Sequence, residues 1–315
     1  MMLGRAASSL YWMCRYVERA ENMARLLDVG NRMALTPGLD AGHREQWEST
    51  LQAAGVAEPF FARKQAATVA NIRDFMLFDE SNPSSVLSCL LAARSNARSV
   101  RTSITTEMWE SINETWLEFS QIRPSSISAN DLPALLDRIK RDTARFRGAM
   151  LNTILRDDGY CFCQLGVFNE RADNTARILD VKYYVLLPSS SLVGSEVDLR
   201  QWSMILRAAS AHRSYRHVYR DRYKAWNIAD FLILRQEMPR SLAHCYRWIS
   251  ATLDQLEELY GNRYACHDQV GAIQAKLEPG TMDMIFRQGL HEFLSEFINA
   301  NNALGAAIAE SYNFH

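Results

Sequence analysis

The sequence predicts an all-α protein, a helical bundle built from two repeated helical halves. Apolar residues make up 48 % of the chain and charged residues 23 %, with only 14 Gly and 8 Pro in 315 residues. This composition is typical of globular helical proteins. Apolar residues recur at helical spacing along most of the chain, and no turn-bounded run of alternating Val, Ile and Thr indicates a sheet. A long internal repeat, described below, indicates a duplicated helical unit.

Four long helices are expected in the first half of the chain. TPGLDAG at 36–42 and RPSSISANDLP at 123–133 are rich in Gly, Pro and Ser, so they are expected to end helices. Asn82-Pro83 places a proline where a helix can begin, with Asn or Ser as its cap. The expected helices are 8–35, 60–78, 84–118 and 131–156.

Four more helices are expected in the second half. RDDGY at 156–160 separates the halves, and LPSSSLVGSEVD at 187–198 and LEPGTMD at 277–283 provide further breaks. The expected helices are 160–187, 196–235, 238–260 and 282–312.

The internal repeat consists of two matches in the same order. ERAENMARLLDV (18–29) and ERADNTARILDV (170–181) share 9 of 12 residues at an offset of 152. Residues 71–89 and 227–245 share 7 of 19 at an offset of 156. Two ordered matches at similar offsets are best explained by duplication.

The repeat divides the chain into halves at 1–157 and 158–315, with a pseudo-two-fold relation between them. The halves could form two bundles or one fused bundle. Because the repeated helix is long, its two copies could pack against each other.

The repeated helix carries a polar stripe, since its charged residues lie within one arc at 100° per residue. Two diverged copies would not keep the same charges if only solvent touched them. A buried ion-pair network and a pocket for a charged ligand are therefore weighed against a solvated face. In the pocket hypothesis Glu18 and Glu170 are general bases. The ligand-binding candidates are Arg15, Arg19, Asn22, Arg25, Arg171, Asn174 and Arg177.

Two basic clusters are candidate contacts for a protein partner or a phosphate group. The second is interleaved with tyrosines, a pattern that also suits nucleic acid, but the formal net charge of −1 disfavours nucleic-acid binding. A solvated face is the alternative for both. The candidates are Arg94, Arg98 and Arg101, which we call the first basic stripe, and Arg213, Arg216 and Arg220, which belong to the basic cluster near residue 215.

Several classes of protein lack support in the sequence. There is no GxxxxGK[ST] loop, GxGxxG turn, GxSxG elbow or ExxH pair, so no cofactor of its own and no metal site are expected. The sequence has no uninterrupted run of 18 apolar residues, so no membrane-spanning helix is expected. The first residues lack the apolar core of a signal peptide, and the six cysteines fit free thiols, so a cytoplasmic location is expected.

Two segments resemble the bacterial alpha-E family, an all-α domain carrying a Glu-Arg motif. They are MLGRAASSLYWMCRYVERAENMARLLDV at 2–29 and LLAARSNARSVRTSITTEMWESIN at 90–113. The second copy of the repeat departs from the first where Val167 stands for Arg15, so a fully symmetric site is not expected.

The resemblance implies a partner rather than a reaction. Members of this family are typically encoded beside, or fused to, a circularly permuted ATP-grasp protein, often with a transglutaminase-like peptidase or a proteasome-like hydrolase. ATP-grasp enzymes activate a carboxylate as an acyl phosphate and transfer it to an amine. The resemblance therefore implies an accessory protein of an ATP-grasp amide ligase that makes a peptide-like metabolite. ATP and Mg would bind the partner, and the substrate would be an amino acid or small peptide.

Two alternatives come from the residues themselves. One is an enzyme or ligand-binding protein that uses the polar stripe; if catalytic, it would form amide bonds together with the ATP-grasp partner. The other is nucleic-acid binding by the Arg-rich helices. Assembly into a homo-oligomer is compatible with each.

Overall fold

The computed structural model describes residues 2–34, 43–184, 195–220, 223–278 and 281–314. These residues form fifteen α-helices, one 3₁₀ turn (Pro124–Ser126) and no strand, so the all-α prediction is confirmed. The helices before residue 157 are α1 (Gly4–Ala34), α2 (His43–Ala54), α3 (Ala57–Phe61), α4 (Val69–Leu77), α5 (Val86–Ser99), α6 (Thr106–Ser120) and α7 (Leu132–Thr153). Those after it are α8 (Asp158–Tyr184), α9 (Glu196–Ala208), α10 (His212–Tyr219), α11 (Ala225–Ile233), α12 (Leu242–Tyr260), α13 (Ala265–Ala275), α14 (Met282–Gln288) and α15 (Leu290–Ser311).

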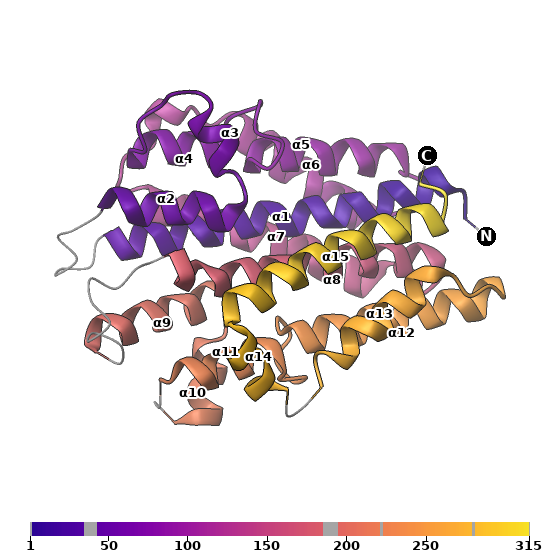
Figure 1. Cartoon of the computed structure of the whole chain (residues 1–315). Coiled ribbons are helices and arrows are strands. Elements are labelled where there is room, and N and C mark those ends of the chain that lie inside the picture. Colours follow the sequence, from indigo (N-terminus) through magenta and orange to yellow (C-terminus); the bar gives the residue numbers. More distant parts are fainter. Residues whose placement is uncertain (1, 35–42, 185–194, 221–222, 279–280, 315) are drawn as a thin grey trace.

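Helices α1 and α8, which carry the two copies of the repeat, lie side by side and run in the same direction (Figure 1). The amide of Met2 donates to Asp158 at 3.1 Å near the start of both helices. Sixteen residues further along, Asn174 donates to the carbonyl oxygen of Glu18 at 3.4 Å. Residue numbers therefore increase in the same direction along both helices, as in a parallel pair.

Gly166 allows the two backbones to approach closely. A Cβ atom at this position would lie 2.2 Å from the carbonyl oxygen of Tyr11, far inside van der Waals contact. Because glycine has no Cβ, α8 can pack directly on the backbone of α1 at this point.

The remaining helices cover the α1–α8 pair. Helices α5 and α7 pack on α1, and α6 packs on both α5 and α7 (Figure 1). Helices α12 and α15 pack on α8, and α13 packs on both α12 and α15. Apolar side chains of α1 such as Leu10, Met13 and Leu27 are fully buried in the resulting core. Burial of apolar surface on most sides of these two helices is the main term that stabilises the bundle.

Four of the expected helices are broken in the structure, and 282–312 is one of them. The range 60–78 is split into α3 and α4, 84–118 into α5 and α6, and 196–235 into α9, α10 and α11. The chain takes left-handed backbone angles at Lys64, Ser210 and Arg220, which a helix cannot contain. Between α5 and α6, Thr105 accepts a hydrogen bond from the amide of Met108 at 3.3 Å and so caps a new helix.

Other boundaries also differ from the prediction. Gly289, with φ of +106°, divides the range 282–312 into α14 and α15. Helices α2 and α13 were not predicted. The expected breaks at 36–42 and, for the most part, 187–198 lie outside the described residues.

The second pair of repeated segments places similar helix starts at equivalent positions. Ser85 caps α5 by accepting from the amide of Ser88 at 3.1 Å, and Ser241 caps α12 by accepting from the amide of His244 at 3.0 Å. The expected helix start at Pro83 is therefore wrong, since the helix begins three residues later. The two-fold relation between halves, and their division at 157, stay predictions.

Among the described residues, no helix combines the length and the apolarity that a membrane span needs. The six cysteines are buried free thiols. In the same part of the chain, no three His, Cys, Asp or Glu side chains are grouped as a metal site would require.

Candidate functional site

The two Glu-Arg dipeptides of the repeat bind each other across the α1–α8 interface. Arg171 donates to Glu18 at 2.6 Å, and Arg19 donates to Glu170 at 2.6 Å. Each glutamate is thus paired with the arginine of the other copy. Glu18 and Glu170 are each only 1 % exposed, so the solvated-face alternative for this stripe is wrong.

Glu18 belongs to a buried group of charges that we call the first cluster. The other carboxylate of the first cluster belongs to Glu21. It accepts a hydrogen bond from Arg240 at 2.7 Å and forms ion pairs with Arg25 and Arg147. Arg147 also reaches Glu18 at 3.1 Å. With four guanidinium groups and two carboxylates, the cluster carries two excess positive charges. Its members are Glu18, Glu21, Arg25, Arg147, Arg171 and Arg240.

Glu170 belongs to a second cluster, which has three guanidinium groups and two carboxylates. Arg15 and Arg19 donate to Glu170 at 2.8 and 2.6 Å. Arg177 donates to Asp173 at 2.6 Å, one turn earlier on the same helix. This cluster carries one excess positive charge.

The second cluster lines a cavity of about 180 Å³ that we call the arginine pocket. Gly55 and Asn302 are exposed members of its wall, so the pocket reaches the molecular surface. Its charged wall is formed by side chains from α1 and α8, and α2 and α15 contribute to its rim. The lining residues are Arg15, Arg19, Asn22, Met23, Ala54, Gly55, Ser84, Glu170, Asp173, Asn174, Arg177 and Asn302.

A chain of buried hydrogen bonds leads from Arg15 into the core. Arg15 donates to the hydroxyl of Tyr11 at 3.3 Å, which donates to Asn169 at 3.0 Å. Asn169 in turn donates to Asn301 at 3.1 Å, and Asn301 also accepts from Tyr246 at 2.9 Å. The chain ties α1, α8, α12 and α15 together and holds Arg15 at the pocket wall.

The electrostatics of both glutamates disfavour the general-base hypothesis. Burial acts to raise the pKa of Glu170, but Arg19 and Arg15 outweigh it and lower that pKa to about 2. Burial also acts to raise the pKa of Glu18, but Arg171 and Arg147 outweigh it and lower that pKa below its ordinary value. A carboxylate that holds its negative charge this strongly is a weak proton acceptor at neutral pH. The arrangement instead suits binding of an anionic group by the guanidinium side chains.

These shifts predict an acid-sensitive fold. The pKa of Glu170 is about 2 in the folded chain, below its unfolded value, so its ion pairs stabilise the fold above about pH 4.5 and lose that contribution as pH falls toward 2. A shift of this size corresponds to a contribution on the order of 3 kcal/mol. The free energy of unfolding measured between pH 6 and 2.5 is expected to fall less steeply in Glu170→Gln than in the unchanged chain. Parallel pH profiles of the two proteins would contradict this.

The arginine pocket gathers five of the seven predicted ligand-binding residues, namely Arg15, Arg19, Asn22, Asn174 and Arg177. The other two, Arg25 and Arg171, lie in the first cluster. Arg25 is held by Glu21 and by the carbonyl oxygen of Ala208 at 2.9 Å. The predicted stripe is thus divided between the two clusters.

The first basic stripe does not form one continuous surface. Arg94 is half-buried, with its guanidinium 4.3 Å from the ring centre of Trp116 and bonded to Asn113 at 2.8 Å. Arg98 is exposed on the last turn of α5, and Arg101 lies beyond the end of that helix. Only the latter two are exposed for a partner.

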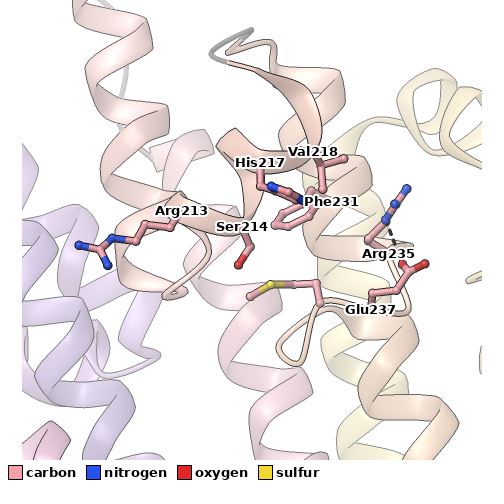
Figure 2. Close-up of a pocket in the computed structure, with 8 residues that line it drawn as sticks. Arg213, Ser214, His217, Val218, Phe231, Arg235 and Glu237 are labelled. Carbon is pink, nitrogen blue, oxygen red and sulfur yellow. Dashed lines mark ion pairs between the residues drawn. The ribbon is translucent and has the colours of Figure 1, made fainter.

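Arg213, Arg216 and Arg220 are exposed on and just after α10. Arg213 borders a cavity of about 490 Å³ between α10 and α11, although its side chain is directed away from the other lining residues (Figure 2). Arg235 and Glu237, both in the segment after α11, form an ion pair at 2.9 Å on one side of this cavity (Figure 2). These arginines stay candidate partner contacts.

The tyrosines of the same segment are turned inward. Tyr215 is fully buried and stacks on Tyr219 and Tyr223, with ring centres 4.9 and 5.6 Å apart. Tyr219 donates to Asp230 at 2.6 Å. Since these rings pack against the protein, they are not presented for stacking on nucleic-acid bases.

Sequence reasoning missed four of the charged residues in the two clusters. Glu21 and Asp173 stand four residues before Arg25 and Arg177, so the i,i+4 spacing could have found them. Arg147 and Arg240 approach from α7 and from the turn before α12, and no local pattern signals their approach.

Comparison with known proteins agrees with the geometry. A family model named Alpha-E, described as a predicted alpha-helical domain with a conserved ER motif, matches residues 2–312. Neither a search of curated proteins nor a search of solved structures gives a significant match. The chain has two Glu-Arg dipeptides, at 18–19 and 170–171, and these are the residues that pair across α1 and α8. The chain therefore belongs to the Alpha-E family.

Proposed function

We propose that this chain is an accessory subunit of an ATP-grasp amide ligase and holds an anionic substrate group in the arginine pocket. The observation that carries the proposal is the pocket itself. It gathers three guanidinium groups against two carboxylates, reaches the surface, and is lined by Arg19 and Glu170, one residue from each Glu-Arg dipeptide. Buried guanidinium groups in excess over carboxylates favour an anionic ligand.

A receptor role fits the rest of the site better than catalysis by this chain alone. The two glutamates are engaged by arginines, and the sequence contains no nucleotide-binding loop. Activation of a carboxylate by ATP would then take place on the ligase. That step gives an acyl phosphate and ADP, and attack by an amine forms the amide and releases phosphate.

The test is a mass-spectrometric product assay with an ATP-grasp protein from the same genome, ATP, Mg²⁺ and a pool of amino acids. A new amide product is expected only when both proteins are present, and the two are expected to associate at micromolar concentration. Formation of the same product at the same rate by the ATP-grasp protein alone would overturn the proposal.

Arg177→Gln is expected to lower the rate of product formation. Arg177 is 25 % exposed at the pocket, and loss of a charge-assisted hydrogen bond to an anion costs about 1.5–3 kcal/mol, or roughly ten- to a hundredfold in rate. Arg200→Gln is the matched control, since Arg200 makes the same i,i+4 pair with Glu196 on an exposed face. Equal rates for the two variants would exclude Arg177 from substrate binding.

A further inference from the structure

Asn22 has an unusual position in the wall of the arginine pocket. It is 2 % exposed, and its Oδ1 atom makes no hydrogen bond to any residue that the structure describes. A buried carbonyl oxygen without a donor costs about 1–3 kcal/mol, so it needs a reason. Asn174, the equivalent residue of the second copy, donates to the carbonyl oxygen of Glu18.

Two arginines in the same wall each have one guanidinium nitrogen that donates no hydrogen bond to a described residue. Arg19 uses Nε and Nη2 to hold Glu170, and Arg177 uses the same two nitrogens to hold Asp173. Within the described residues, Nη1 of each arginine donates no hydrogen bond. The pocket therefore offers donors suited to an anion and one buried acceptor suited to an N–H group.

The size of the pocket restricts the ligand. About 180 Å³ is well below the roughly 300–1,000 Å³ of sites for drug-sized molecules, and a nucleotide would not fit. The ligand must be small and must carry an anionic group and an amino group close together.

We infer that the arginine pocket binds a free α-amino acid, with its carboxylate on the guanidinium groups of Arg19 and Arg177 and its ammonium group on Oδ1 of Asn22. The inference rests on the proposed function only in that the bound amino acid would be a substrate of the ligase. The binding itself needs this chain alone.

The test is calorimetric titration of the full chain with each of the twenty amino acids. The best binder is then compared with the same molecule lacking its amino group and lacking its carboxylate; for alanine these are propionate and ethylamine. At least one amino acid is expected to bind, and each truncated analogue is expected to bind at least about tenfold more weakly, because one buried partner is left unpaired. Absence of binding by all twenty, or equal binding of inorganic phosphate or of the deaminated analogue, would overturn the inference.

Asn22→Leu separates a ligand contact from a structural role. Leucine removes the unpartnered oxygen, so the melting temperature is expected to stay equal or rise, while the preference for the amino acid over its deaminated analogue disappears. An unchanged preference in this variant would contradict the inference. The comparison of analogues on the unchanged chain decides the matter even if the variant does not fold. The titrations contain no ligase, so absence of amino-acid binding would not test the association with the ligase. In the same way, a negative product assay would not affect the result of the titrations.

Discussion

Glu21→Gln is expected to destabilise the protein by about 3–5 kcal/mol, the usual cost of removing one partner from a buried ion-pair network. The carboxylate of Glu21 is 1 % exposed and accepts from Arg25, Arg147, Arg240 and the hydroxyl of Thr143. Its loss leaves four guanidinium groups with the carboxylate of Glu18 alone. The free energy of unfolding from guanidinium chloride denaturation measures the effect.

The matched control is Glu118→Gln. Glu118 pairs with Arg138 on the surface, where its side chain is 59 % exposed. Because water screens such pairs, the change is expected to cost less than about 1 kcal/mol. If Glu21→Gln costs no more than this control, the first cluster does not stabilise the fold.

Gly166→Ala is expected to force α1 and α8 apart. Overpacking of a close interface typically costs about 1–3 kcal/mol, and the cost here is expected at or above the upper end because the new methyl group meets backbone rather than a movable side chain. Separation of the helices also lengthens the ion pairs between the two Glu-Arg dipeptides. Thermal denaturation and the free energy of unfolding measure the loss.

Gly148→Ala is the control for this change. Gly148 lies inside α7, and a Cβ there meets no atom within 4 Å. Replacing a helical glycine by alanine without a clash is expected to stabilise by about 0.5–1 kcal/mol. Equal effects of the two changes would mean that α1 and α8 do not pack as closely as the structure shows.

The repeat made the central helix pair predictable. The same Glu, Arg and Asn at the same spacing in both copies pointed to α1 and α8 and to most of the arginine pocket. The repeat could not indicate how the charged residues are distributed between the two clusters. That distribution depends on which side chains of other helices contact Glu18 and Glu170. Arg15 has no counterpart in the second copy, where Val167 stands, and around Glu18 its place is taken by Arg147 and Arg240.

The broken helices were harder to predict for a different reason. Lys64, Ser210 and Arg220 take left-handed backbone angles without being glycine, so composition gives no warning of these turns. The basic cluster near residue 215 shows the same limit. Its tyrosines are interleaved with arginines in the sequence, but helical geometry turns Tyr215 inward and the arginines outward.

The central claim is that the two Glu-Arg dipeptides of this Alpha-E chain bind each other rather than act within their own helix. A double-mutant cycle between Glu170→Gln and Arg19→Gln, built from four free energies of unfolding, tests it directly. A coupling energy of about 1–3 kcal/mol is expected for this pair, and a clearly smaller one for the neighbours Glu170 and Arg171, whose side chains have different partners. Coupling below about 0.5 kcal/mol between Glu170 and Arg19, within the range of independent sites, would contradict the claim.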